Sequence, residues 1–393
     1  MIEIENWWLL AIPLFFVLGW LASRFEQRAV LRDKGRLPDA YSKGLNFLLN
    51  EQSDKAVDAF VDVVRIEPDA IETHFALGNL FRRRGETDRA IRVHQNLVER
   101  KNLPDEQRDH ALFELGQDFL KAGLLDRAED VFNRLEGTQY GPAALHHRLE
   151  ITQMVRDWTA AIAIAERLER DFRENHRREI AHFHCELAQK RLAGKEPGAS
   201  TAARNQAEIA LQVDSEHARA HLLRGQIAFQ DSDFELAICA WEDLLRYSPA
   251  HLALVVVEWL GAHRAINKSA AGIEQAENLL SKHPSSDIFA ALAEAKAAEN
   301  GAEAAQIWAE QQLRKTPSLL GLEKLLALRA QSAPNEQHGD MELIQKMIQA
   351  QARRLSRYVC NHCGFKARQF YWQCAGCNRW DTYAPKRSEE LEV

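Results

Sequence analysis

Residues 74–98 read HFALGNLFRRRGETDRAIRVHQNLV, and this stretch decides the fold of most of the chain. Gly78 and Ala90 are small residues twelve positions apart, with Gly85 between them and larger apolar residues around them. Helices that cross closely need small side chains at the crossing, and a left-handed glycine can end the first helix. The stretch therefore predicts a helix, a tight turn and a second helix packed against the first.

The same pattern returns along the chain with a period near 34 residues. Small residues recur at Ala56, Ala90, Ala128, Ala161, Ala203, Ala237, Gly272 and Ala305. Prolines, which cannot continue a helix, follow several of them at Pro68, Pro249, Pro284 and Pro317. Helix-turn-helix units at this spacing resemble the tetratricopeptide repeat. We expect about eight such units over residues 39–317 and two degenerate capping helices within residues 318–357.

A solenoid of this kind offers a groove, lined by the first helix of each unit, where a peptide or protein segment binds. Counting from the repeat register, we predict the groove residues Phe75, Asn79, Arg82, Arg83, Gln117, Lys121, Gln226 and Phe229. The sequence contains no phosphate-binding loop, nucleophile elbow or zincin helix. His182 and His184 point to different sides of a helix, which favours packing or surface roles. We therefore expect a binding protein and not an enzyme.

Four cysteines lie close together near the C-terminus, at Cys360, Cys363, Cys374 and Cys377. Two Cys-x-x-Cys pairs can place four thiolates tetrahedrally around one ion, and an all-sulfur site suits zinc or iron. The pairs resemble a rubredoxin-like or zinc-ribbon knuckle, although their ten-residue separation is far shorter than in an electron-transfer rubredoxin. We predict a structural knuckle over residues 358–387 that holds one iron or zinc ion, followed by a tail over residues 388–393.

Charge is distributed unevenly over the 393 residues. The formal net charge is −7, yet residues 351–387 carry eight Lys or Arg and one Asp, so the remainder sums to −14. Basic residues among aromatic ones leave a nucleic-acid-binding zinc ribbon as one alternative function, and rubredoxin-like electron transfer as another. Docking on the acidic repeats or on anionic lipid uses the same charges, and we expect no nucleic acid as partner. With 46% apolar residues, a disordered or collagen-like chain is excluded.

The first residues predict a membrane anchor. Residues 7–22 carry no charge, and the stretch from Ile4 to Ala22 makes about 28 Å of helix, against about 30 Å of hydrocarbon. Arg24, Arg28 and further basic residues follow the span, which favours a periplasmic N-terminus and a cytoplasmic body. We expect a single-pass anchor over residues 1–23 and a basic linker over residues 24–38.

Taken together, the predicted fold is all-α: a tetratricopeptide-repeat solenoid with one N-terminal transmembrane helix and a small rubredoxin-like metal module. This order resembles the lipopolysaccharide assembly protein B family of Gram-negative bacteria. The resemblance implies a non-catalytic adaptor at the cell inner membrane that regulates lipopolysaccharide synthesis. It also implies the partners: a membrane-bound ATP-dependent protease, the committing deacetylase of lipid A synthesis, and other lipopolysaccharide assembly proteins.

Overall fold

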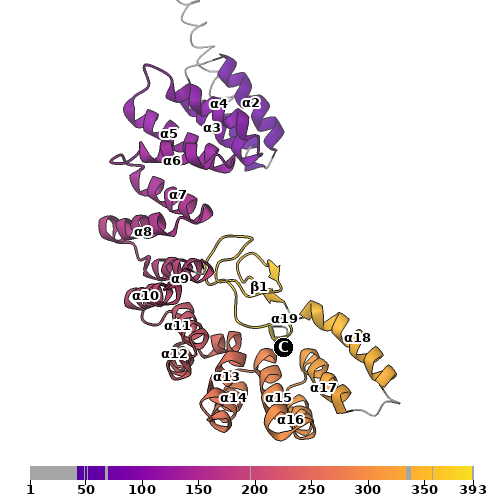
Figure 1. Ribbon diagram of the computed structural model, residues 1–393. Helices are drawn as coiled ribbons and strands as arrows, with labels where there is room; N and C mark the ends of the chain where they lie inside the picture. Colours follow the sequence, from indigo (N-terminus) through magenta and orange to yellow (C-terminus); the bar gives the residue numbers. More distant parts are fainter. Residues whose placement is uncertain are drawn as a thin grey trace, which may run out of the picture. The chain divides into compact units, whose positions relative to one another are not determined.

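The computed structural model describes residues 42–47, 49–50, 52–66, 70–194, 196–332, 338–355 and 357–391 (Figure 1). The predicted membrane anchor and linker lie outside these residues. Within the described residues, no helix has the length and apolar character that a membrane span requires. The chain divides into two compact units between Arg156 and Asp157.

The first unit is a series of antiparallel helix pairs. Its helices are α2 (Ser53–Ile66), α3 (Ile71–Arg83), α4 (Thr87–Val98), α5 (Asp105–Lys121), α6 (Leu125–Asn133) and α7 (Gly141–Met154). Gly85 and Gly123 end α3 and α5 with φ of 77° and 76°, as the turn glycines of the sequence predict. Phe60, Leu97 and Phe132 are fully buried between the helices.

The second unit continues the helix pairs and ends in the cysteine module. Its helices are α8 (Trp158–Phe172), α9 (Arg177–Ala193), α10 (Ala199–Val213), α11 (Ala218–Gln230), α12 (Phe234–Tyr247), the 3-10 helix η1 (Pro249–Leu254), α13 (Val256–Ala265), α14 (Ser269–Lys282), α15 (Ser286–Asn300), α16 (Ala302–Lys315), α17 (Leu319–Ser332), α18 (His338–Leu355) and α19 (Ser388–Leu391). Two short strands, β1 (Tyr358–Val359) and β2 (Lys366–Ala367), pair antiparallel.

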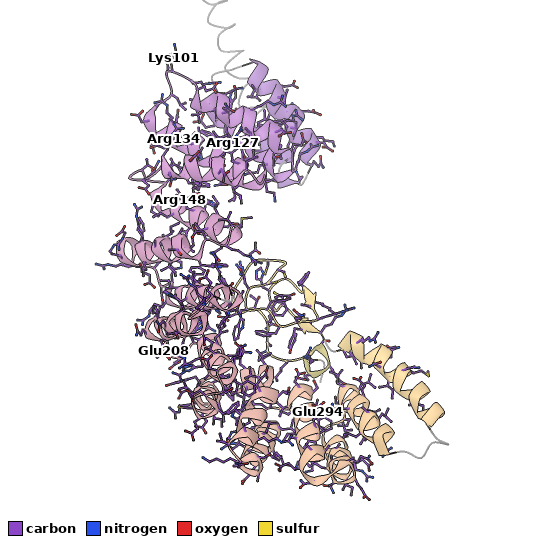
Figure 2. The ribbon with its side chains drawn as sticks, viewed as in Figure 1. Lys101, Arg127, Arg134, Arg148, Glu208 and Glu294 are labelled. Atoms are coloured by element: carbon purple, nitrogen blue, oxygen red, sulfur yellow. The ribbon has the colours of Figure 1, made fainter. Side chains whose placement is uncertain are left out.

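Side chains at the helix ends set several of these boundaries. The carboxylates of Asp157 and Asp233 accept hydrogen bonds from the backbone N–H groups of Ala160 and Leu236, and so cap α8 and α12. Helix α12 ends at Tyr247, and Pro249 begins η1 instead of a new α-helix. Exposed charged residues cover the outer sides of helices, as Arg127, Arg134 and Glu208 show (Figure 2).

At four of the helix crossings, a glycine lies against a ring sixteen residues later. Gly44 lies against Phe60, Gly78 against His94, Gly116 against Phe132 and Gly225 against Trp241. In all four cases a Cβ on the glycine would overlap the ring. The small residue is therefore required by one aromatic or imidazole side chain of the second helix, which fills the space that the absent side chain leaves.

Candidate metal centre and its docking surface

The four cysteines form two hooks with the same backbone geometry. The carbonyl of Cys360 accepts from the N–H of Gly364 (2.9 Å), and the carbonyl of Cys374 accepts from the N–H of Asn378 (2.8 Å). Gly364 and Asn378 both have positive φ, at 74° and 55°. Glycine and asparagine tolerate this conformation best, so these two residues allow each hook to turn its sulfurs inward.

The sulfur positions fit one tetrahedral ion. All four Sγ atoms lie within 4.8 Å of one another. The Sγ atoms of Cys360 and Cys377 are 3.9 Å apart, and those of Cys363 and Cys374 are 3.7 Å apart. Four sulfurs at about 2.3 Å from zinc would be separated by about 3.8 Å, so the cluster has the size that the ion needs. The four cysteines thus form a metal-binding cluster, and the ion would hold the two hooks together.

Local donors favour the thiolate form of one buried cysteine. Burial opposes ionisation of Cys374, but the backbone N–H groups of Gly376 and Cys377 outweigh it and lower the pKa of this thiol. The Gly376 nitrogen lies 3.3 Å from the Cys374 sulfur. Metal ligation requires the deprotonated sulfur, so these N–H groups prepare the site for an ion.

Trp380, just after the second hook, docks the module on the helices of the same unit. Its indole stacks on the imidazole of His182 in α9, with ring centroids 4.5 Å apart and planes at 20°. Phe183 and Trp158 meet the indole edge-on, and the guanidinium of Arg219 lies 5.8 Å from its ring centroid. An indole held between apolar rings and a cation makes a large contact for one side chain.

The neighbouring residue, Asp381, adds a polar contact at the same place. Its carboxylate accepts from Nε2 of His182 (2.9 Å) and from Nε of Arg178 (2.6 Å). Burial alone would raise the pKa of Asp381, but the hydrogen bond with His182 and the charge of Arg178 hold that pKa well below its usual range. Burial lowers the pKa of His182. An aspartate thus fixes a buried, neutral histidine to the metal module.

The sequence suggests that the knuckle docks on the repeats, but it does not identify the residues that form this surface. It assigned His182 a packing or surface role, and the structure shows a fully buried ring that contacts Trp380 and Asp381. The two partners are 199 residues apart in the chain, so no local pattern links them. The only usable signal was the aromatic richness of the module, which implies that its rings are buried against something.

A second contact joins the module to η1 through Trp372, whose ring centroid also lies 6.0 Å from that of His182. Trp372 stacks on His251 of η1, with centroids 5.1 Å apart and planes at 14°. Burial lowers the pKa of His251 to about 4. Arg387 makes a third contact, because its Nε and Nη2 donate to the two oxygens of Asp287 in α15, each at 2.9 Å. The module is therefore attached to α9, η1 and α15 at once.

The predicted groove residues have different surroundings in the structure. Phe75 is buried and stacks on His110 with centroids 4.1 Å apart, and Phe229 packs against Phe234 and Trp241. Arg83 and Lys121 are exposed, and Gln117 is half-buried. Gln226 lines a cavity between α11, η1, α13, α15 and the metal module.

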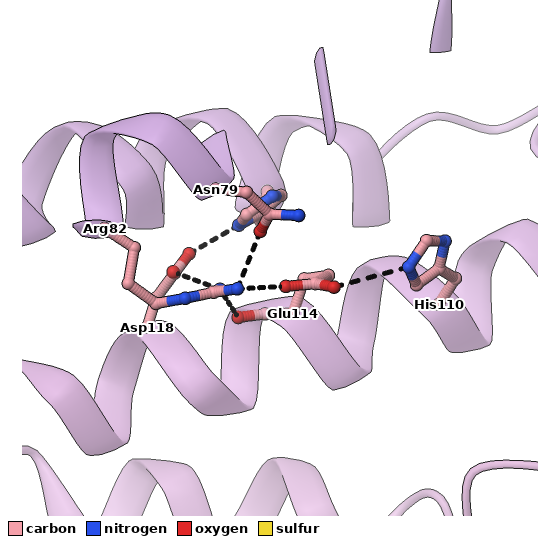
Figure 3. Close-up of polar contacts among 6 residues, drawn as sticks. Asn79, Arg82, His110, Glu114 and Asp118 are labelled. Atoms are coloured by element: carbon pink, nitrogen blue, oxygen red, sulfur yellow. Dashed lines mark hydrogen bonds and ion pairs between the residues drawn. The ribbon is translucent and has the colours of Figure 1, made fainter. Parts of the chain in front are cut away.

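Arg82 and Asn79 belong to a polar network between α3, α4 and α5 (Figure 3). The guanidinium of Arg82 donates to Glu114 Oε2 (2.5 Å), to Asp118 Oδ1 (2.8 Å) and to Asn79 Oδ1 (2.7 Å). The other oxygen of Asp118 pairs with Nδ1 of His94 at 2.5 Å. Burial opposes ionisation of Glu114, but His110 and Arg82 hold its pKa at about 2.

Comparisons with known proteins agree with both parts of this architecture. Residues 358–385 match a family described as a rubredoxin metal binding domain, and residues 75–144 and 198–250 match the tetratricopeptide repeat. Among solved structures, the TPR2AB domain of yeast Sti1 in a pHSP90 complex is 14% identical, with a TM-score of 0.33. It covers 71% of this chain and 97% of its own.

Relatives from Escherichia coli and Haemophilus influenzae match almost the whole chain. Lipopolysaccharide assembly protein B of Escherichia coli (strain K12) is 33% identical over 381 residues, which is 96% of this chain and 97% of the relative. The protein of the same name from Haemophilus influenzae is 30% identical over 396 residues, which is 97% of this chain and 98% of the relative. The helical repeat array with its four-cysteine module therefore belongs to the lipopolysaccharide assembly protein B family.

Proposed function

We infer that this chain is a membrane-anchored, non-catalytic adaptor that limits lipopolysaccharide synthesis. In this proposal it presents the committing deacetylase of lipid A synthesis to a membrane-bound ATP-dependent protease at the inner membrane. The single observation that supports it is the 33% identity to lipopolysaccharide assembly protein B over 96% of the chain, repeats and metal module together.

The proposal assigns a task to each part of the chain. Residues 1–23 anchor it and residues 24–38 link the anchor to the repeats of residues 39–317, which hold the client. The helices of residues 318–357 cap the repeats, the knuckle of residues 358–387 binds iron or zinc, and residues 388–393 form a tail. An anchor that holds a client beside a membrane protease raises their effective concentration, so modest affinity for each partner is enough.

The metal module has a mechanical part in this proposal. It contacts α9 at His182, η1 at His251 and α15 at Asp287, and so restrains helices that are distant in the sequence and that would hold the client. When bound, the ion supplies structural cross-linking of the two hooks. This chain's own Trp380, Trp372 and Arg387 transmit that order to the solenoid. Arg83, Gln117 and Lys121 remain proposed client contacts in the first unit.

A pulse-chase measurement of the deacetylase half-life in cells tests the proposal. Cells with the intact chain should degrade the deacetylase quickly. Cells with the chain lacking residues 1–22, or carrying Cys360→Ser with Cys363→Ser, should stabilise it several-fold, because the client loses either the membrane or the ordered surface. Cys239→Ser is the matched control, since Cys239 is an exposed cysteine outside the cluster. An unchanged half-life in both altered strains, with the protein still present, would refute the adaptor role.

A further inference from the structure

A cavity lies between the metal module and the helices of the second unit. Its volume is about 640 Å³, within the range of about 300 to 1,000 Å³ of ligand sites. The helix side is formed by α9, α11, η1, α13 and α15. The module side is formed by Tyr358, Arg368, Gln369, Phe370, Trp372 and Arg387. A second cavity of about 280 Å³ adjoins it along α13 and α15, and the two share Val257, Ala291 and Glu294. The two cavities make one elongated groove.

The floor of this groove is apolar and open. Leu222, Val256 and Ala291 are buried beneath it, while Val257 is 61% exposed within the lining. A valine exposed to this degree beside buried apolar residues offers a surface for another apolar side chain. The groove can therefore hold a segment that contributes such a side chain.

The polar residues of the lining divide into paired and unpaired groups. Asp287 is paired with Arg387, and Glu294 with Lys324. In contrast, Gln226, Glu258, Arg368 and Gln369 have side chains that form no hydrogen bond or ion pair with any residue that the structure describes. Two amides, one carboxylate and one guanidinium thus remain available toward an occupant.

The positions of these four side chains indicate how a bound segment would be oriented in the groove. Arg368 and Gln369 line the groove from the module, and Gln226 and Glu258 line it from α11 and α13. Glutamine amides both donate and accept, which matches the N–H and C=O groups of an extended peptide. The guanidinium favours an acidic group on the module side, and the carboxylate favours a basic group on the α13 side.

We propose that this groove binds an extended peptide segment of the client protein, with an acidic residue facing Arg368, a basic residue facing Glu258 and an apolar residue on Val257. The inference rests on the proposed adaptor function, because it names where and how the client is held. Since the module provides one wall, metal binding and client binding become linked through the groove.

Site-directed photocrosslinking with the full chain in cells tests this groove. A benzophenone amino acid replaces Val257, and the matched control places it at Ile307 of α16, which is 55% exposed and outside the groove. We expect a protein adduct from position 257, and mass spectrometry should locate it in a segment with acidic and basic residues on either side of an apolar one. An adduct yield no higher than at position 307, or an adduct with lipid or nucleic acid, overturns the proposal.

Charge reversal provides the decisive arm of the test. Arg368→Glu and Glu258→Lys should each lower the adduct yield about tenfold, the equivalent of one lost ion pair in a partly desolvated site. Lys282→Glu, an exposed charge change on α14, should leave the yield unchanged. In the double variant Arg368→Glu with Glu258→Lys, the adduct yield should recover when the acidic and basic residues of the mapped client segment are also exchanged. Adduct yields that do not change in the Arg368→Glu and Glu258→Lys variants would overturn the proposal.

The result separates this inference from the adaptor function itself. If the charge variants keep full adduct yield while the deacetylase is still degraded quickly, only the groove inference is wrong. If the adduct follows the charges but the deacetylase half-life never depends on the chain, the groove binds a client and the adaptor function is wrong.

Discussion

At the scale of single residues, Arg82 shows what a groove prediction from the repeat register leaves out, namely the partners that a side chain has within the protein. The repeat register places it on the first helix of a unit, where an exposed arginine would meet a client. In the structure its guanidinium donates hydrogen bonds to Glu114, Asp118 and Asn79. Asp118 is fully buried, and the charge that neutralises it comes from another helix. A register of small residues cannot reveal such a pair, because it records spacing and not partners.

Replacing Arg82 by alanine should destabilise the first unit by about 3 to 5 kcal/mol, since Asp118 and Glu114 would stay buried without their cation. Amide hydrogen exchange in α3 and α5 measures the loss within the full chain. Arg83→Ala is the matched control, because its exposed side chain should contribute less than about 0.5 kcal/mol. Equal exchange in the two variants would contradict this role for Arg82.

At the scale of helices, the crossing of α11 and α12 depends on Gly225. A Cβ at this position would overlap the indole of Trp241, which is fully buried and donates to the carbonyl of Leu222 (3.3 Å). The sequence predicts the crossing from the spacing of Gly225 and Ala237. It does not predict which large residue fills the gap, because that depends on how the second helix rotates about its axis.

Two glycine-to-alanine substitutions should therefore have opposite effects. Gly225→Ala should cost about 1 to 3 kcal/mol through overpacking against Trp241. Gly261→Ala in α13 should raise the free energy of unfolding by about 0.5 to 1 kcal/mol, because alanine restricts the unfolded chain more than glycine does. The added Cβ would lie 3.6 Å from Phe229, which is an ordinary van der Waals contact. Chemical denaturation of the full chain, followed by tryptophan fluorescence, gives both signs. Destabilisation of similar size by both substitutions would contradict the packing argument.

The chain beyond the knuckle joins helix ends that are distant in sequence. Glu389 accepts hydrogen bonds from the backbone N–H groups of Leu319 and Leu320 at the start of α17. Glu390 accepts from the backbone N–H (2.8 Å) and hydroxyl (2.5 Å) of Ser286 at the start of α15. A carboxylate at a helix N-terminus satisfies free N–H groups and favours the helix dipole. The sequence suggests only a tail, because acidic residues at a chain end usually face water.

Replacing Glu389 and Glu390 together by glutamine should loosen the first turns of α15 and α17 at a cost of about 1 to 2 kcal/mol. Faster hydrogen exchange confined to those turns is the expected observation. Lys386→Gln serves as the control, because it removes a nearby charge without touching either helix end. Uniform acceleration across the second unit, or none at all, would argue against capping by these carboxylates.

At the scale of the molecule, the sequence is most informative where one physical requirement acts over a short distance. Four thiolates for one ion give the knuckle, and a small residue at each crossing gives the helix pairs. Contacts between segments that are distant in the sequence cannot be predicted from residue spacing of this kind. The stacking of Trp380 on His182, and of Trp372 on His251, forms only when the cysteine module has folded back onto α9 and η1.

Those same contacts make the stability of the second unit depend on pH. Burial lowers the pKa of His182 and of His251, the latter to about 4, and places that of His217 well below its usual value. The charges beside them are Asp381, Arg178 and Arg219. A histidine whose pKa is lower when folded binds its proton mainly after unfolding. Its contribution is complete above about pH 6.5 and is lost as the pH falls toward the folded value.

We therefore expect the free energy of unfolding to decrease from pH 7 to pH 5, with His251 alone accounting for about 2 kcal/mol. Denaturation of the metal-loaded chain at both pH values, with bound metal measured in parallel, checks this. In the His251→Gln variant, the decrease in the free energy of unfolding between pH 7 and pH 5 should be smaller by the contribution of His251. Glutamine does not titrate, and it can still form a hydrogen bond with Ser248. A decrease that is identical in this variant, or that occurs only as metal is released, would assign the pH dependence to the cysteine cluster instead of the buried histidines.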